Sequence, residues 1–388
     1  MVDSRLRNIA YARYKAQKKQ NERRLLAIIT LLITATVMLV TVVQSQSLAF
    51  SFFSPDGMLP SQQSSATAPL IPRLADSKLL ALLTPEKFSP LYANTSLRPF
   101  KSKPEQRPLL PMVLGNEDAE LESRLQGLFQ AYEPNFESYL FFYDLQDGTY
   151  VDINGYKPSQ AASVIKLPVL YSFFREVDAG NIDFDTPLLY LSQHRAGGAG
   201  GLQYKEPGFA LPALEVARDM IQWSDNTETN MVIDYIGGIN TVNRHWSDIG
   251  LTRTRVSNQL PDLTGTNKIS AYEMAAILYN IETGYGLSER SRNAALDILK
   301  GTHNKRLIPA RLPADTVIAH KTGDIGTMLG NAAIVYLPDG RKYLLAVQVE
   351  RPFNDYTARD IIQMASRMVY DHEVAKITPE VIVNNPTQ

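Results

Sequence analysis

The sequence predicts an α+β domain, an antiparallel β-sheet flanked by helices with a helical subdomain, preceded by one transmembrane helix. Strand-like runs stand at both ends of the region 115–375, and about 150 residues of mainly helical and loop pattern separate them. Strands at the two ends of one domain must pair around the helices between them, which is an α+β arrangement. A basic segment followed by an apolar run near the N-terminus predicts the membrane helix.

The folded region begins with apolar residues at helical spacing from 118 to 132. Apolar runs at 138–145 and 149–153 follow, and Asp147-Gly148 between them is a hairpin signal. After the helical middle, strand patterns return at 316–323, 332–337 and 343–349, with the first of them expected at the sheet edge. Pro338-Asp339-Gly340 joins the last two strands, and a helical stretch at 356–370 ends the domain.

The N-terminal region has the charge pattern of a membrane anchor. Residues 1–24 contain eight Lys and Arg against two acidic residues, a net charge of +6, directly before 19 uncharged residues at 25–43. As a helix that run would extend roughly 28 Å, about one hydrocarbon thickness. The positive-inside rule puts residues 1–24 in the cytoplasm and the folded region outside, in an extracytoplasmic or periplasmic position. A cleaved signal peptide is the alternative, with small residues available at 47–49.

The expected domain organisation follows from these patterns. Residues 1–24 are a basic cytoplasmic segment and residues 25–43 the transmembrane anchor. Residues 44–114 are rich in proline, which prevents a continuous helix and favours an extended linker. Residues 115–375 form the folded domain, and residues 376–388 a C-terminal tail.

Composition excludes several classes of function. The chain has no cysteine, which excludes disulfides, thiolate metal sites and a cysteine nucleophile. A net charge of -1 over 388 residues gives no nucleic-acid footprint. The five histidines lack metal-ligand spacing, so neither a metal site nor a cofactor is expected, and His320 is expected to be a packing residue. The glycine-rich run 197–201 does not fit a dinucleotide-binding motif and is expected to be a flexible loop.

Ser163 and Lys166 form an S-x-x-K motif at the start of an expected helix. Residues three apart share one helical face, so the Lys166 amine can reach the Ser163 hydroxyl, and the helix dipole favours an alkoxide at this end. A neutral lysine can accept the serine proton when burial or a nearby cation lowers its pKa. The motif alone has little weight, because a chain of this length holds about one or two matches by chance.

Two further motifs change its weight. Ser224-Asp225-Asn226 begins 61 residues after Ser163, and Lys321-Thr322-Gly323 begins 97 residues after Ser224. Each triplet is expected about 0.1 times or fewer in a chain of this length. S-x-x-K, S-D-N and K-T-G in this order are the signature of class A β-lactamases and penicillin-binding proteins. Residues 120–370 resemble that family.

The resemblance implies a role for each matching residue. Ser163 would be the acylated nucleophile and Lys166 its proton acceptor, while Ser224 would relay the proton to the leaving nitrogen. Lys321 would help to keep the pKa of Lys166 low, since two nearby ammonium groups disfavour each other. The structural alternatives are a helix cap for Ser224 and a solvated edge charge for Lys321.

The implied substrate contacts complete the site. Asn226 would hydrogen-bond the side-chain amide of the substrate, and Lys321 and Thr322 would bind its carboxylate. The backbone N–H groups of Ser163 and Asp324 would form the oxyanion hole. Many family members add an arginine that helps to hold the carboxylate, but residues 323–337 of this chain contain none.

One departure from the family pattern concerns deacylation. Class A enzymes place a glutamate in the loop between the S-D-N and K-T-G motifs, where it activates the deacylating water. Residues 251–269 contain no glutamate, and Asp262 is their only carboxylate. Asp262 is either a shorter substitute base or a turn residue after Pro261. Acylation is therefore expected to be intact and turnover to be slow.

Three functions fit this pattern. The first is a membrane-anchored β-lactamase that opens β-lactam rings through an acyl-enzyme on Ser163. The second is a D,D-peptidase that acts on peptidoglycan stem peptides through the same acyl-enzyme chemistry. The third is a penicillin-binding sensor that stays acylated. The S-D-N motif favours the first, and the missing glutamate favours the other two.

Overall fold

The structure, a computed structural model, describes residues 108–109 and 111–377. The expected membrane anchor at 25–43, nearly all of the expected linker and most of the expected tail lie outside the described residues. Among the helices of the described part, none is long and apolar enough to cross a membrane.

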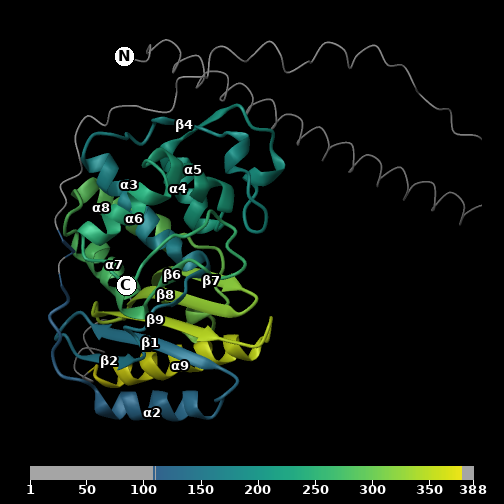
Figure 1. The fold of residues 1–388 in the computed structure, drawn as a ribbon. Coiled ribbons are helices and arrows are strands. Elements are labelled where there is room, and N and C mark those ends of the chain that lie inside the picture. Colours follow the sequence, from purple (N-terminus) through teal and green to yellow (C-terminus); the bar gives the residue numbers. More distant parts are fainter. Residues whose placement is uncertain (1–107, 110, 378–388) are drawn as a thin grey trace, which may run out of the picture. The chain divides into compact units, whose positions relative to one another are not determined.

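A five-stranded antiparallel sheet joins the two ends of the catalytic domain, in the order β2-β1-β9-β8-β7 (Figure 1). Its strands are β1 (Glu137–Asp144), β2 (Tyr150–Ile153), β7 (Val317–Ile325), β8 (Met328–Tyr336) and β9 (Lys342–Glu350). The N-terminal hairpin pairs with the C-terminal strands through β1 and β9, where Phe141 lies opposite Ala346. The α+β prediction is confirmed, and β7 is the edge strand.

Two helices cover one face of the sheet, α2 (Ala119–Gln130) and α9 (Thr357–Ala375) (Figure 1). The Asp118 carboxylate caps α2 by accepting a hydrogen bond of 2.9 Å from the Leu121 backbone N–H. β1 is buried on both faces: Leu140 and Phe142 pack on the side of these helices, and Phe141 and Tyr143 pack on the other. A strand buried on both faces appears in the sequence as the continuous apolar run that predicted it.

The other face carries the helical subdomain. Its helices are α3 (Lys166–Asp178), α4 (Ala213–Gln222), α5 (Asn226–Tyr235), α6 (Ile239–Asp248), α7 (Ala271–Thr283) and α8 (Glu289–Lys300). Two short strand pairs belong to this part, β3 (Ser159–Gln160) with β6 (Lys268–Ile269) and β4 (Pro187–Leu189) with β5 (Ala210–Pro212). Helix α3 is buried over nearly its whole length, as expected of a helix enclosed by others. Lys166, its first residue, is therefore buried with it.

One strand begins earlier than the sequence predicts. The apolar pattern suggests a start at 332, whereas β8 begins at Met328. Gly330 and Asn331 interrupt the apolar run, but both are buried. The Asn331 side chain is satisfied because it accepts from the Ile308 N–H at 3.1 Å and donates to the Lys321 carbonyl at 2.8 Å. A polar residue with internal partners does not end a strand.

Candidate active site

The three sequence motifs meet at one point of the fold. Ser163 lies in a 3-10 helix, η3 (Ala162–Ile165), that leads directly into α3, where Lys166 is the first residue. Ser224 lies between α4 and α5, and Lys321 lies on the edge strand β7. In a 3-10 turn, side chains three apart eclipse one another, which brings Lys166 Nζ to 3.1 Å from Ser163 Oγ. Pro168 is tolerated in α3 because it falls in the first turn.

The surroundings of Lys166 suit a proton acceptor. Its Nζ donates to the Ser224 carbonyl oxygen at 2.6 Å and to Asn226 Oδ1 at 2.8 Å, and both of these oxygens are acceptors only. A neutral amine has two N–H groups for these acceptors. Its lone pair is then left for the hydroxyls of Ser163 and Ser224, each 3.1 Å away. Burial lowers the pKa of Lys166 well below its ordinary value, and the nearby Lys321 charge lowers it further.

Lys321 forms the second half of the cluster. Its Nζ donates to Ser224 Oγ at 2.9 Å and to the Thr322 carbonyl oxygen at 2.8 Å, and its side chain is fully buried. Burial lowers the pKa of Lys321 to about 7. Ser224 Oγ thus lies between the two lysine amines, where it can receive a proton from one side and give one up on the other.

Neither structural alternative for these residues holds. The N-cap of α5 is Asp225, whose carboxylate accepts from the Glu228 N–H at 3.0 Å, so Ser224 is not the cap. Lys321 is buried instead of solvated. His320, its neighbour, is buried with Nδ1 3.4 Å from the Asn331 amide, in agreement with a packing role.

Backbone strain is concentrated beside the reactive side chains. Ala162, just before Ser163, and Ser224 itself have φ values of +46° and +58°. The left-handed region is costly for residues with a Cβ and persists only where the surroundings enforce it, often at functional sites. The tight turns hold the two serine hydroxyls toward the lysines.

A steric constraint explains why the third residue of the K-T-G motif is a glycine. A Cβ at Gly323 would lie 3.0 Å from the Val164 backbone nitrogen and 3.1 Å from that of Ser163. The edge strand therefore passes directly against the backbone of the nucleophile, which only a glycine permits without a shift. Asp324 follows on the same strand, and the part of its N–H group in an oxyanion hole stays a prediction.

An arginine does reach this edge of the sheet, and it comes from outside residues 323–337. Arg351, directly after β9, is buried, and its guanidinium donates to the Asp324 carboxylate and to the Ile325 carbonyl oxygen at 3.0 Å. Burial raises the pKa of Asp324, and the Arg351 charge opposes that rise. β8 pairs with β7 on one side and with β9 on the other, and these two pairings bring Asp324 and Arg351 together although they are far apart in sequence.

The loop 251–269 is fastened to the helix that carries Asn226. Asn230, one turn further along α5, accepts from the Leu260 N–H at 3.0 Å and donates to the Leu260 carbonyl oxygen at 2.8 Å. Residues four apart share one face of a helix, so this clamp holds Leu260 on the face that bears Asn226. The residue at that position is apolar and buried. Neither Asn230 nor Leu260 was predicted from the sequence as a site residue, although Asn230 stands four residues after Asn226.

Asp262 is held by its own loop. Its Oδ2 accepts from the Asn267 N–H at 2.6 Å, and its Oδ1 accepts from the Thr266 hydroxyl at 2.8 Å. The Thr264 hydroxyl is a third donor at 3.3 Å. These contacts favour the interpretation of Asp262 as a turn residue, and its action as a base stays a prediction.

The glycine-rich segment 197–201 is docked on the S-D-N motif, although the sequence suggested a flexible loop. The Asn226 side chain donates to the Gly197 carbonyl oxygen at 2.8 Å, and Asp225 Oδ2 accepts from the Leu202 N–H at 2.9 Å. A Cβ at Gly200, where φ is +98°, would collide with the Asp225 side chain. Glycine is required there for close approach of the loop to α5.

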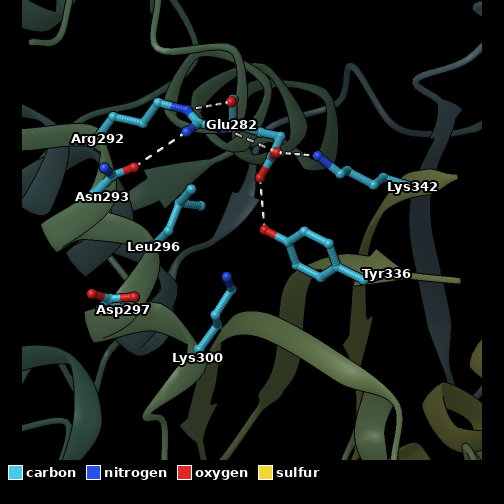
Figure 2. A pocket seen from close by; sticks show the side chains of 8 residues that line it. All are labelled: Glu282, Arg292, Asn293, Leu296, Asp297, Lys300, Tyr336 and Lys342. Atoms are coloured by element: carbon cyan, nitrogen blue, oxygen red, sulfur yellow. Dashed lines mark hydrogen bonds and ion pairs between the residues drawn. The ribbon is translucent and has the colours of Figure 1, made fainter. Parts of the chain in front are cut away.

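A hollow of about 420 Å³ lies apart from this cluster, between the end of α7, helix α8 and strands β8 and β9 (Figure 2). At its centre the buried Glu282 carboxylate accepts from Tyr336 Oη and Lys342 Nζ, each at 2.7 Å, and from the Arg292 guanidinium at 3.3 Å. These bonds fasten α8 and the sheet to the end of α7. None of the motif residues lines this hollow.

The model of the β-lactamase enzyme family matches residues 120–373, well over half of the chain. The chain belongs to this family. It is a class A β-lactamase-like serine hydrolase, and the enzyme class predicted from the three motifs is confirmed.

Relatives and solved structures agree with this membership. Extended-spectrum β-lactamase PER-1 of Pseudomonas aeruginosa is 25% identical over 249 residues, which are 58% of this chain and 79% of the relative. A β-lactamase of Bacteroides uniformis is 26% identical and covers 67% of this chain and 93% of its own length. The structure of PBP-A is 39% identical with a TM-score of 0.66 and covers 68% of this chain and 100% of its own. A leucine-to-glutamate mutant of PBP-A, also 39% identical, is described as an acyl-enzyme complex with penicillin G.

Proposed function

We propose that β-lactams acylate Ser163 and that the acyl group is released slowly, so that this family member binds penicillin with weak turnover. The observation that carries the proposal is a contrast within the site. The network that acylation needs is complete in Ser163, Lys166, Ser224 and Lys321. The loop beside it holds the apolar Leu260 on the face of α5 that carries Asn226, and its single carboxylate, Asp262, is bound by donors of the loop itself.

Acylation follows from the contacts of the two hydroxyls. Neutral Lys166 takes the proton from Ser163 Oγ, which attacks the carbonyl carbon of the lactam. The ring C–N bond breaks as the Ser163 ester forms, and the ring nitrogen takes the proton of Ser224 Oγ. Lys166 returns its proton to Ser224, so the amine and both serines balance at the end of the step. Lys321 and Thr322 bind the substrate carboxylate, and Asn226 binds the amide of its side chain.

Deacylation requires a base that removes a proton from water. Such a positioned group contributes typically 100- to 10,000-fold. Leu260 cannot act as a base, and the oxygens of Asp262 are engaged by donors of its own loop. The similarity to PBP-A, a mutant of which is described as an acyl-enzyme with penicillin G, supports acylation at the equivalent serine.

Rapid-mixing kinetics with benzylpenicillin, followed by intact mass, test the proposal. We expect one equivalent of acyl-enzyme in a burst, followed by release at least about 100-fold slower than the enzyme median of about 10 per second. Ser163→Ala should abolish labelling and change the free energy of unfolding by no more than about 1 kcal/mol, because a methyl group fits the place of the hydroxyl. Steady hydrolysis near the enzyme median without a burst would overturn the proposal.

A D,D-peptidase is the second candidate, and the absence of a glutamate from residues 251–269 favours it. The same acyl-enzyme chemistry would act on a peptide ending in D-alanyl-D-alanine. Release of D-alanine from a synthetic acyl-D-alanyl-D-alanine peptide, lost in the Ser163→Ala variant, would identify this activity. No release, together with slow hydrolysis of benzylpenicillin, would favour the β-lactamase function.

The proposed location is the outer face of a membrane, with residues 25–43 as an uncleaved single-pass anchor. The support is the net charge of +6 in residues 1–24 before 19 uncharged residues. A catalytic domain outside the cytoplasm would meet β-lactams and peptidoglycan.

A further inference from the structure

An exposed aromatic pair stands next to the catalytic serines. Trp223 is the residue directly before Ser224, and its side chain is 58% exposed. Its ring stacks on that of His303, with the ring centroids 3.9 Å apart and the planes inclined by 35°. Single exposed apolar side chains are common on protein surfaces, so the feature that distinguishes Trp223 is its contact with a second ring directly beside a motif serine.

The pair is fixed by the chain around it. The His303 N–H donates to the Gln222 carbonyl oxygen at 3.2 Å, so the loop after α8 is tied to the end of α4. A Cβ at Gly301 would lie 2.0 Å from the Gln222 side chain, which means that loop and helix are in tight contact. The Trp223 N–H closes α4 by donating to the Asp219 carbonyl oxygen at 3.2 Å. A surface ordered in advance loses little entropy when a ligand binds.

The same contacts locate the pair beside the proton donor of the reaction. Trp223 precedes Ser224, and the Thr302 hydroxyl donates at 2.6 Å to the carbonyl oxygen of His320, which precedes Lys321. Trp223 is thus next in the chain to Ser224, and His303 follows a residue that is bonded to the neighbour of Lys321; the side chains of Ser224 and Lys321 are themselves joined by a hydrogen bond of 2.9 Å. Because Ser224 protonates the leaving nitrogen, the rings lie toward the leaving-group side of the substrate.

We propose that Trp223, stacked on His303, forms a binding subsite for a flat aromatic or heteroaromatic group that the substrate carries on its leaving-group side. The inference rests on the proposed acylation of Ser163 and adds a determinant of substrate choice to it. Stacked aromatic pairs contribute about 0.5–1.5 kcal/mol beyond the burial of their area, which corresponds to roughly 2- to 12-fold in binding. A cationic ring gains further from the electron-rich face of an indole.

Three cephalosporins with the same thienylacetamido side chain isolate the subsite. Cephalothin carries an acetoxymethyl group at C3, cephaloridine a pyridiniummethyl group, and nitrocefin a dinitrostyryl group. The second-order acylation constant of the full chain is measured for each, in the wild type and in Trp223→Ala, Trp223→Phe and His303→Ala. We expect Trp223→Ala to lower the constants for cephaloridine and nitrocefin by about 3- to 10-fold relative to cephalothin. Trp223→Phe should restore most of the difference, and His303→Ala should cause a smaller loss.

The comparison separates a binding role from a structural one. An equal loss for all three compounds, unrelieved in Trp223→Phe, would mean that Trp223 only supports Ser224 and would overturn the subsite. Unchanged constants in Trp223→Ala would overturn it as well. A wild type that none of the three acylates would reject the proposed function itself, and the inference with it. Thermal unfolding of each variant confirms that the exposed position tolerates the change.

Discussion

Lys166 and Lys321 bring two buried amines to the partly exposed hydroxyls of Ser163 and Ser224. Both side chains are fully buried, and burial lowers the pKa of each. Their proposed tasks require opposite protonation states, because Lys166 must be neutral to accept a proton and Lys321 must be charged to bind a carboxylate. Like charges at short range disfavour each other, so a charged Lys321 keeps Lys166 neutral. The proposed mechanism therefore requires that Lys166 is neutral while Lys321 is charged.

The pH dependence of acylation tests this arrangement. The constant should rise with pH as Lys166 loses its proton and fall above about pH 7, where Lys321 becomes neutral and the substrate carboxylate loses its partner. Lys321→Arg keeps its charge throughout, since the guanidinium pKa lies above about 12, so its falling limb should move to higher pH. The measurement is the benzylpenicillin acylation constant between pH 5 and pH 10, at the ionic strength of the wild-type series. A falling limb that does not move in Lys321→Arg would assign it to another group.

Helix α5 organises the site at the level of elements. Its N-cap, Asp225, binds the end of the glycine-rich segment, and its first residue, Asn226, accepts a hydrogen bond from Lys166. Its second turn provides Asn230 for the loop 251–269. The glycine-rich segment and the loop 251–269 are thus both attached to the helix that carries Asn226.

Replacing Leu260 with glutamate tests whether the acyl-enzyme is hydrolysed slowly because the loop lacks a base. Leu260→Glu should shorten the lifetime of the benzylpenicillin acyl-enzyme by about 100-fold, because it supplies a base on the face of α5 that carries Asn226. Leu260→Gln is the matched control, with the same shape and no base, and should leave the lifetime long. Intact mass after rapid mixing measures both. Equal lifetimes in the two variants would argue that the Leu260 side chain does not reach the deacylating water.

Asp262→Asn tests whether Asp262 is the base for the deacylating water or a turn residue of the loop 251–269. The amide replaces an acceptor with a donor against the Asn267 N–H or the threonine hydroxyls. We expect a loss of about 1–3 kcal/mol in the free energy of unfolding and an unchanged acyl-enzyme lifetime. Urea unfolding and intact mass measure the two quantities. A longer lifetime with unchanged stability would identify Asp262 as the base.

Over the whole molecule, the site lies where the edge of the sheet meets the helical subdomain. The sheet contributes β7, and the subdomain contributes η3, α3 and the α4–α5 connection. Neither part holds a complete proton path by itself. Correct pairing of the N-terminal and C-terminal strands is therefore a condition of activity as well as of folding.

Membrane attachment is the prediction that belongs to the full chain. Because residues 1–24 are strongly basic and residues 25–43 uncharged, we expect the full-length protein to stay in the membrane pellet after carbonate extraction. A variant with two arginines inserted in the middle of 25–43 should become extractable, since each costs about 2.5–3.5 kcal/mol at the centre of a helix. Recovery of a shortened, soluble protein that begins near Phe50 would instead identify a cleaved signal peptide.

The sequence by itself determined the α+β class, the enzyme family and the three motifs whose residues Ser163, Lys166, Ser224 and Lys321 come together in the fold. The strands could be predicted because a strand buried on both faces appears as a continuous apolar run. The motif residues could be predicted because each motif is a short pattern of neighbouring residues with a known chemistry. Gly323 was identified in the sequence as part of the K-T-G motif. Only the structure shows why a glycine stands there, because a Cβ would press on the backbone of Ser163.

Tertiary structure alone decided the remaining parts of the site. The Arg351–Asp324 pair depends on strand pairing. The position of Leu260 depends on its hydrogen bonds with Asn230. The Trp223–His303 ring contact depends on the packing of two helix ends. The burial that lowers the pKa of Lys321 to about 7 is likewise a property of the enclosed fold. Contacts of this kind join residues far apart in the chain, and no local pattern records them because each partner is ordinary in its own segment.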